Sequence, residues 1–109
     1  MMLLMRIERW DVKRDGGLTD AALLHKLQAL GFEPVGRVYP AGAVAAARID
    51  TRARVEAVIL GLIKVTVDGE SAILAAGDMV FIPARATRRL EVVGTSPAYC
   101  FEAASRDEA

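Results

Sequence analysis

The sequence predicts a small antiparallel β barrel that carries one helix near its N-terminus. Nine short segments rich in Val and Ile follow one another along the chain, and turn residues such as Gly61, Gly77 and Gly94 separate them. Many short strands at regular spacing, with turns between them, are typical of β sandwiches and barrels. Just one stretch has the composition and periodicity of a helix. The expected strands cover residues 6–12, 36–39, 44–50, 55–60, 63–68, 71–75, 79–82, 87–93 and 98–103.

Two local patterns define the clearest elements. The helix is expected at about residues 20–30, with Thr19 able to cap its first free amides and Gly31 placed to end it. Its apolar face is formed by Leu23, Leu27 and Leu30. A hairpin is expected where residues 63–68 alternate between apolar and polar side chains and the chain then turns at Asp68-Gly69.

Length and composition limit the possible functions. The chain has 109 residues, in which 14 Lys and Arg balance 14 Asp and Glu. A net charge of zero disfavours a nucleic-acid or anionic-membrane partner, because such binding depends on excess positive charge. One His and one Cys are too few for a disulfide scaffold within one chain or for a zinc cluster. The apolar start, residues 1–5, is shorter than a signal-peptide core or a membrane span, so we expect a cytoplasmic protein.

We expect a single domain over residues 1–109. Its parts are an N-terminal strand and helix over about 1–32, a barrel core over about 36–103 and a loose tail at 104–109. Apolar residues make up 53% of the chain, which indicates a well-packed core and favours an apolar contact between subunits.

Two spacings resemble the motifs of the cupin superfamily. Gly42, Arg48, Asp50, Arg54 and Gly61 follow the spacing of the first motif, G-x5-H-x-H-x3-E-x6-G. The second motif, G-x5-P-x-G-x2-H, is matched by the positions of Gly77, Pro83, Arg85 and Arg88. The resemblance covers about residues 36–103 and implies a small single-domain cupin, a double-stranded β-helix (jelly-roll) barrel. Arg85 stands where the second motif has its glycine, so the local turn departs from the family pattern.

The metal-binding positions of the family are degenerate in this chain. The resemblance places the four ligands at Arg48, Asp50, Arg54 and Arg88. A guanidinium is always protonated and has no lone pair for a metal, so only Asp50 remains competent. We therefore expect no metal cofactor, and no other cofactor is indicated.

The same positions point into the barrel in a cupin, which predicts a pocket rich in arginine. Side chains alternate along a strand, so Glu56 shares a face with Arg54. The candidate pocket is formed by Arg48, Asp50, Arg54, Glu56 and Arg88, and Glu102 is left open because its strand parity is less secure. Three cations against two carboxylates leave one positive charge, which suits a small carboxylate, phosphate or sugar ligand. Alternatively, the five charges neutralise one another and form a plug that binds nothing.

Other residues suggest ordinary structural roles. His25 is expected on the helix surface, Cys100 in the core and Trp10 in the first strand. Tyr99 and Phe101 share a face and pack in the core or line the pocket.

Three functions stay open at this point. The first is a metal-free cupin that is non-catalytic or binds a small anionic ligand in its arginine-lined pocket; the resemblance also implies a homodimer. The second is a metal-independent isomerase or epimerase, for which Glu56 or Asp50 would need a raised pKa that neighbouring arginines oppose. The third is a structural or interaction module with no ligand.

Overall fold

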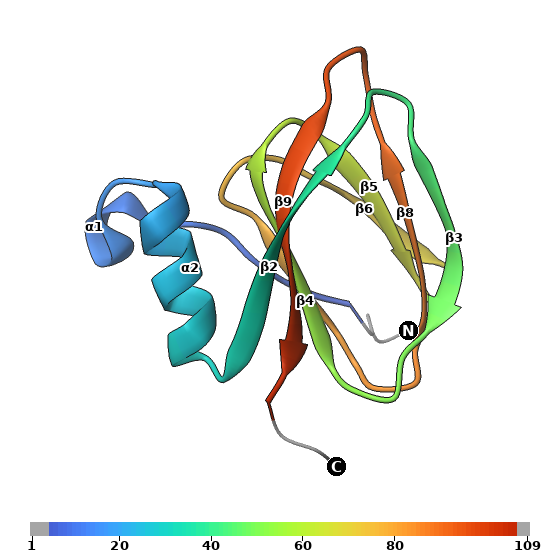
Figure 1. The fold of residues 1–109 in the computed structure, drawn as a ribbon, viewed down its shortest axis with the longest axis horizontal. Coiled ribbons are helices and arrows are strands. Elements are labelled where there is room, and N and C mark those ends of the chain that lie inside the picture. The colour runs from blue at the N-terminus through green and yellow to red at the C-terminus, as the bar shows by residue number, and fades with distance from the viewer. Residues whose placement is uncertain (1–4, 107–109) are drawn as a thin grey trace.

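The computed structural model describes residues 5–106 and consists of two antiparallel sheets with two short helices beside them (Figure 1). The elements are β1 (Arg6–Glu8), α1 (Val12–Asp15), α2 (Asp20–Ala29), β2 (Phe32–Tyr39), β3 (Val44–Ile49), β4 (Arg54–Leu60), β5 (Ile63–Val67), β6 (Glu70–Leu74), β7 (Met79–Ile82), β8 (Thr87–Val92) and β9 (Ala98–Ser105). One sheet has the strand order β1-β7-β4-β9-β2 and the other has the order β3-β8-β5-β6. This is the jelly-roll barrel that the sequence predicts.

Two apolar layers hold the sheets and the longer helix together. The larger layer lies between the two sheets and includes Val58, Ile63 and Cys100. The second layer contains Leu23 and Leu27 of α2, which pack on the outer face of the five-stranded sheet. Figure 1 shows α2 beside β2, on the side away from β3. The space between β2 and β3 is therefore left free of the helix.

Helix α2 confirms most of its predicted features. The Thr19 side chain accepts a hydrogen bond from the Ala22 amide at 3.0 Å, and Gly31 takes a φ of 94° just after the helix. Leu30 differs from the prediction. It is the C-cap residue and is 44% exposed, whereas Leu23 and Leu27 are fully buried.

The N-terminal segment also differs from the prediction. The expected strand at 6–12 is shorter, and Trp10 follows it rather than lying within it. Asp11 caps α1 by accepting hydrogen bonds from the amides of Lys13 and Arg14, which favours a helical turn over an extended strand. The Trp10 side chain packs against the apolar layer under α2.

The strand boundaries shift at two other places. β2 begins at Phe32, four residues before the expected 36–39, because its pairing with β9 starts at Phe32 and Ser105. Ala104 and Ser105 were expected in the tail and belong to β9. Residues 107–109 lie outside the described part of the chain. No helix within residues 5–106 is long and apolar enough to span a membrane.

The predicted hairpin is confirmed. β5 and β6 pair from Ile63–Leu74 to Val67–Glu70. Asp68 and Gly69 both have positive φ, 47° and 85°, which is the conformation of a tight two-residue hairpin turn.

Gly61 links the two sheets and has no room for a side chain. It joins β4 to β5 with a φ of 91°, and a Cβ there would lie 2.7 Å from the Pro97 carbonyl oxygen and 2.9 Å from the Ala98 Cα. We expect Gly61→Ala to lower the free energy of unfolding by roughly 3 kcal/mol, through left-handed strain and a forced backbone shift. Denaturant titration measures the loss.

Gly69→Ala is the matched control, since Gly69 has a φ of 85° and no atom within 4 Å of its added Cβ. It should lose about 1 kcal/mol, and equal losses would contradict the steric argument.

Candidate functional site

Arg88 lies at the centre of a group of charged side chains inside the barrel. It belongs to β8 and is 7% exposed. Its Nη1 lies 3.4 Å from Glu56 Oε1, and its Nη2 lies 3.4 Å from Glu102 Oε2. Its Nε lies 3.5 Å from Asp50 Oδ2. One guanidinium therefore contacts three carboxylates.

Two further arginines complete this group, which we call the ion-pair cluster. Arg54 Nε lies 2.9 Å from Asp50 Oδ2, and Arg54 Nη1 donates to Glu102 Oε1 at 2.9 Å. Arg48 Nη2 lies 3.5 Å from Asp50 Oδ1. The members of the ion-pair cluster are Arg48, Asp50, Arg54, Glu56, Arg88 and Glu102.

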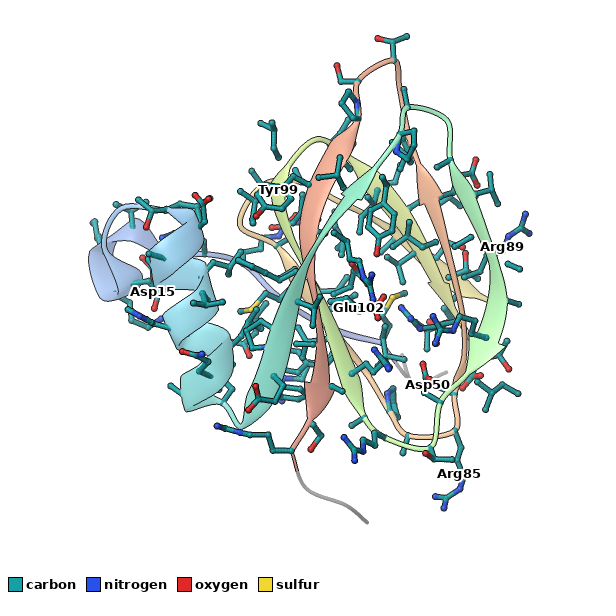
Figure 2. The ribbon with its side chains drawn as sticks, viewed as in Figure 1. Asp15, Asp50, Arg85, Arg89, Tyr99 and Glu102 are labelled. Atoms are coloured by element: carbon teal, nitrogen blue, oxygen red, sulfur yellow. The ribbon has the colours of Figure 1, made fainter. Side chains whose placement is uncertain are left out.

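The register of the two sheets explains why these residues meet. Glu56 and Glu102 are direct neighbours on β4 and β9, in the five-stranded sheet. Arg48 and Arg88 are direct neighbours on β3 and β8, in the other sheet. Like charges opposite each other within a sheet are unfavourable, and each pair is compensated by opposite charges across the barrel. Figure 2 shows Asp50 and Glu102 inside the barrel.

The expected excess of one positive charge is not found in this cluster. Glu102, whose orientation the sequence left open, turns inward and contacts both Arg54 and Arg88. Three guanidiniums then face three carboxylates. When all three carboxylates are ionised, the cluster is charge-balanced, because β9 pairs with β4 in the register that aligns Glu102 with Glu56.

Glu56 is the most deeply buried carboxylate of the cluster, with 1% of its surface exposed. Burial and, to a smaller extent, the nearby Glu102 raise its pKa to about 7, against the opposing attraction of Arg88. The Tyr39 hydroxyl donates a hydrogen bond to Glu56 Oε2 at 3.2 Å, and burial together with Glu56 raises the pKa of Tyr39 above its ordinary value. Arg88 opposes a raised pKa of Glu56, as the sequence led us to expect, but desolvation outweighs its attraction.

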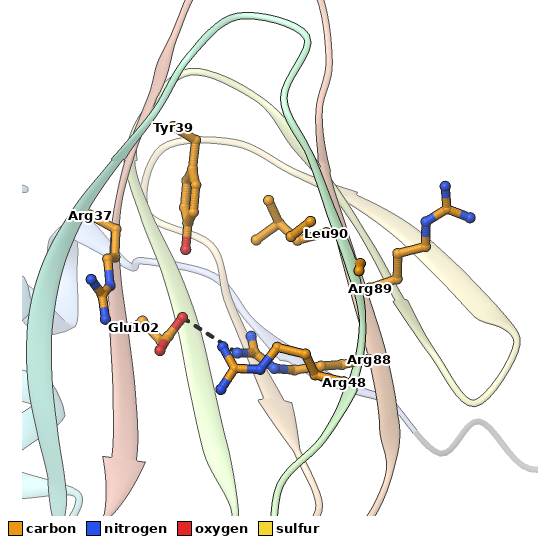
Figure 3. A pocket seen from close by; sticks show the side chains of 9 residues that line it. Arg37, Tyr39, Arg48, Arg88, Arg89, Leu90 and Glu102 are labelled. Atoms are coloured by element: carbon orange, nitrogen blue, oxygen red, sulfur yellow. Dashed lines mark hydrogen bonds and ion pairs between the residues drawn. The ribbon is translucent and has the colours of Figure 1, made fainter.

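A pocket with a volume of about 320 Å³ opens against the cluster, between β2 and β3 (Figure 3). This is at the lower end of the range for small-molecule sites, about 300–1,000 Å³. Its lining residues are Arg37, Tyr39, Ala45, Ala46, Arg48, Arg88, Arg89, Leu90 and Glu102. Figure 3 shows Arg37 on the β2 side and Arg48 on the β3 side, while the side chain of Arg89 points away from the pocket.

The predicted site residues divide into two sets. Arg48 and Arg88 line the pocket, whereas Asp50, Arg54 and Glu56 belong to the cluster without lining the pocket. Arg37 and Tyr39 also line the pocket and were not among the predicted site residues. Arg37 and Tyr39 are two residues apart in the expected strand 36–39. Because such residues share a face of the strand, this spacing could have predicted that both face the pocket.

The remaining single residues take the places that were expected of them. His25 is exposed on α2, and Cys100 is fully buried between the sheets. Burial raises the pKa of the Cys100 thiol above its ordinary value. Phe101 packs in the apolar layer under α2, and its ring centroid lies 6.2 Å from that of Tyr99. Tyr99 is not among the pocket-lining residues.

A sequence model described as the cupin domain matches residues 37–103, which is more than half of the chain. The chain belongs to the cupin family. The match covers the strands from the middle of β2 to β9 and all residues of the ion-pair cluster. Arg85 of this cupin has a φ of 67°, so the turn keeps a glycine-like conformation although the glycine of the motif is missing.

Solved structures show the same fold. An RmlC-like cupin from Shewanella frigidimarina is 22% identical, with a TM-score of 0.63, and the match covers 72% of this chain and 68% of that one. A conserved protein of unknown function from Streptococcus pyogenes is 18% identical, with a TM-score of 0.64 over 72% and 68% of the two chains. Salicylate 1,2-dioxygenase from Pseudoaminobacter salicylatoxidans is 20% identical, with a TM-score of 0.63 over 93% of this chain and 25% of that one. No curated protein matches the sequence.

The residues at the metal positions of this cupin converge but do not suit a metal ion. Arg48, Arg54 and Arg88 all meet Asp50, within 3.5 Å. Three buried polar atoms of the cluster have no hydrogen bond: Asp50 Oδ2, Arg54 Nε and Arg88 Nε. Two of these are protonated donors, which repel a cation and offer it no lone pair. Within residues 5–106, no group of three or more His, Cys, Asp or Glu is arranged to hold a metal.

Proposed function

We propose that this cupin binds a small anionic molecule in the pocket between β2 and β3. The observation that carries the proposal is Arg37, an exposed arginine in the pocket lining with no ion-pair partner among residues 5–106. The ion-pair cluster is balanced, so Arg37 supplies the positive charge that remains at the pocket. A guanidinium pairs well with carboxylate and phosphate groups.

The plug and the pocket are compatible in this proposal. Arg54, Arg88 and the three carboxylates form ion pairs with one another inside the barrel, as the plug hypothesis supposes. Arg48 is 53% exposed and meets Asp50 only at 3.5 Å, which is longer than the about 2.7–2.9 Å of a strong charge-assisted hydrogen bond. Arg48 can therefore bind a ligand while giving up only a weak interaction with Asp50.

Thermal melting with a panel of carboxylates, phosphates and neutral sugars tests the proposal. We expect at least one anion to raise the melting temperature, because a ligand that binds only the folded state stabilises it. Arg48→Gln should weaken the binding of that anion about tenfold or more, the loss expected for a hydrogen bond to a charged group. Arg9→Gln removes an exposed cation outside the pocket lining and should leave binding unchanged. A panel without any shift would contradict the proposal and favour a module with no ligand.

A metal-independent enzyme is the second candidate, and the environment of Glu56 favours it. A carboxyl with a pKa of about 7 has the proton affinity of a general acid or base at neutral pH. Glu56 does not line the pocket, but the Tyr39 hydroxyl bonded to it belongs to a pocket-lining residue. If a substrate is turned over, Glu56→Gln should reduce kcat at least a hundredfold while the protein still melts cooperatively. Unchanged turnover in Glu56→Gln would remove the acid–base role.

The homodimer expected from the family resemblance stays a prediction. Large apolar side chains are exposed on several strands, among them Val38, Ile49 and Leu60, which are 70%, 66% and 64% exposed. They supply apolar surface for a second copy. The pocket itself is built within one chain, so the proposed binding does not depend on a partner.

A further inference from the structure

The lining of the pocket contains two chemically different kinds of group. Ala45, Ala46 and Leu90 of β3 and β8 are apolar. Arg37 and Arg48 supply cationic groups from the two strands that flank the opening. β2 pairs with β9 and β3 pairs with β8, so the pocket lies between two strands that belong to different sheets. A ligand in the pocket therefore contacts both guanidinium groups and apolar side chains.

The charges at the pocket limit how much negative charge a ligand can carry. Arg88 and Glu102 both line the pocket, but each is already engaged by the other at 3.4 Å. Arg54 also donates to Glu102, at 2.9 Å. The carboxylate of Glu102 lies between Arg37 and the arginines of the opposite strands in Figure 3, and it would repel negative charge on the ligand. Arg37 and Arg48 compensate this repulsion for one carboxylate better than for two.

The pocket lining also offers few types of polar group to a ligand. The Tyr39 hydroxyl donates to Glu56, and the remaining lining is guanidinium, carboxylate or hydrocarbon. A second charged group placed against Ala45, Ala46 and Leu90 would lose its hydration without gaining a partner, which is costly. A sugar would find few neutral donors and acceptors for its hydroxyl groups.

We infer that the ligand is a small amphipathic monocarboxylate. Its carboxylate binds the exposed guanidiniums of Arg37 and Arg48, and its apolar body lies against Ala45, Ala46 and Leu90. The inference rests on the proposed anion binding and specifies which anion is preferred. The apolar body contributes affinity through burial of hydrocarbon, and the arginines orient the single charged end.

Isothermal titration with five simple probes tests the ligand class. Benzoate carries one carboxylate and an apolar ring, acetate lacks the ring, benzamide lacks the charge, terephthalate has a second carboxylate, and inorganic phosphate has no apolar body. We expect benzoate to bind at least tenfold more tightly than each of the other four. Arg37→Gln and Arg48→Gln should each weaken benzoate at least tenfold, while Arg9→Gln should not change its affinity. Circular dichroism melting shows whether each variant is folded.

The outcomes separate the ligand class from anion binding itself. If phosphate, terephthalate or acetate binds as tightly as benzoate, and Arg48→Gln weakens it, anion binding stands and the monocarboxylate class is wrong. If benzoate binds equally well to folded Arg37→Gln, the placement of the carboxylate is wrong. If benzamide matches benzoate, the pocket selects for hydrocarbon and the charged end plays no part. Absence of binding by all the charged probes contradicts both proposals.

Discussion

Replacing Arg88 by methionine should lower the free energy of unfolding by about 3–5 kcal/mol, the range found when one partner of a buried ion pair is removed. Arg88 is 7% exposed and contacts Asp50, Glu56 and Glu102. Without it, three carboxylates lie close together with Arg54 and the more exposed Arg48 as their remaining cations. Chemical denaturation at neutral pH measures the loss.

Arg89 provides the matched control for this substitution. It is the next residue on β8, is exposed, and points away from the barrel in Figure 2. Arg89→Met should change the free energy of unfolding by less than about 0.5 kcal/mol, as is usual for surface substitutions. If Arg88→Met and Arg89→Met lose the same amount, the cluster does not contribute to stability as the contacts indicate. Combining Arg88→Met with Glu102→Gln should recover part of the loss, because the two residues interact directly.

Glu56 should make the protein less stable as the pH rises from about 4.5 to 7. Its pKa is raised from 4.5 to about 7 in the folded protein, so over this interval the folded state binds more protons than the unfolded state. Stability then falls with increasing pH and levels off above pH 7. At 1.36 kcal/mol per pKa unit, the total change is about 3 kcal/mol. Urea denaturation at half-unit pH steps measures it.

Two variants isolate the contribution of Glu56. Glu56→Gln replaces the carboxyl by a neutral group of similar shape and should remove the fall in stability between pH 4.5 and 7. Asp15→Asn should still show that fall. Hydrogen bonds from Arg14 and Lys26 lower the pKa of Asp15. The stabilising contribution of ionised Asp15 is therefore lost only as the pH falls below 3.8, the ordinary pKa of an aspartate side chain. A wild-type profile that is flat between pH 4.5 and 7 would show that Arg88 keeps Glu56 ionised in spite of its burial.

Local sequence patterns predicted the elements whose structure depends on neighbouring residues. The β5–β6 hairpin follows from alternation and the Asp68-Gly69 turn, and the start of α2 follows from Thr19. The errors lie where tertiary contacts decide. β2 extends back to Phe32 because β9 is available to pair with it, and the strand expected at 6–12 is interrupted by the cap at Asp11.

The candidate site shows the same division. Sequence by itself predicted the barrel, because glycine spacing and strand alternation are local properties. The resemblance to the cupin motifs implied arginines at three of the four ligand positions. Only the tertiary structure decided that Glu102 contacts the arginines of the cluster, that Arg37 has no ion-pair partner within residues 5–106, and that burial raises the pKa of Glu56. These three features depend on strand register and desolvation, which arise when the two sheets pack together.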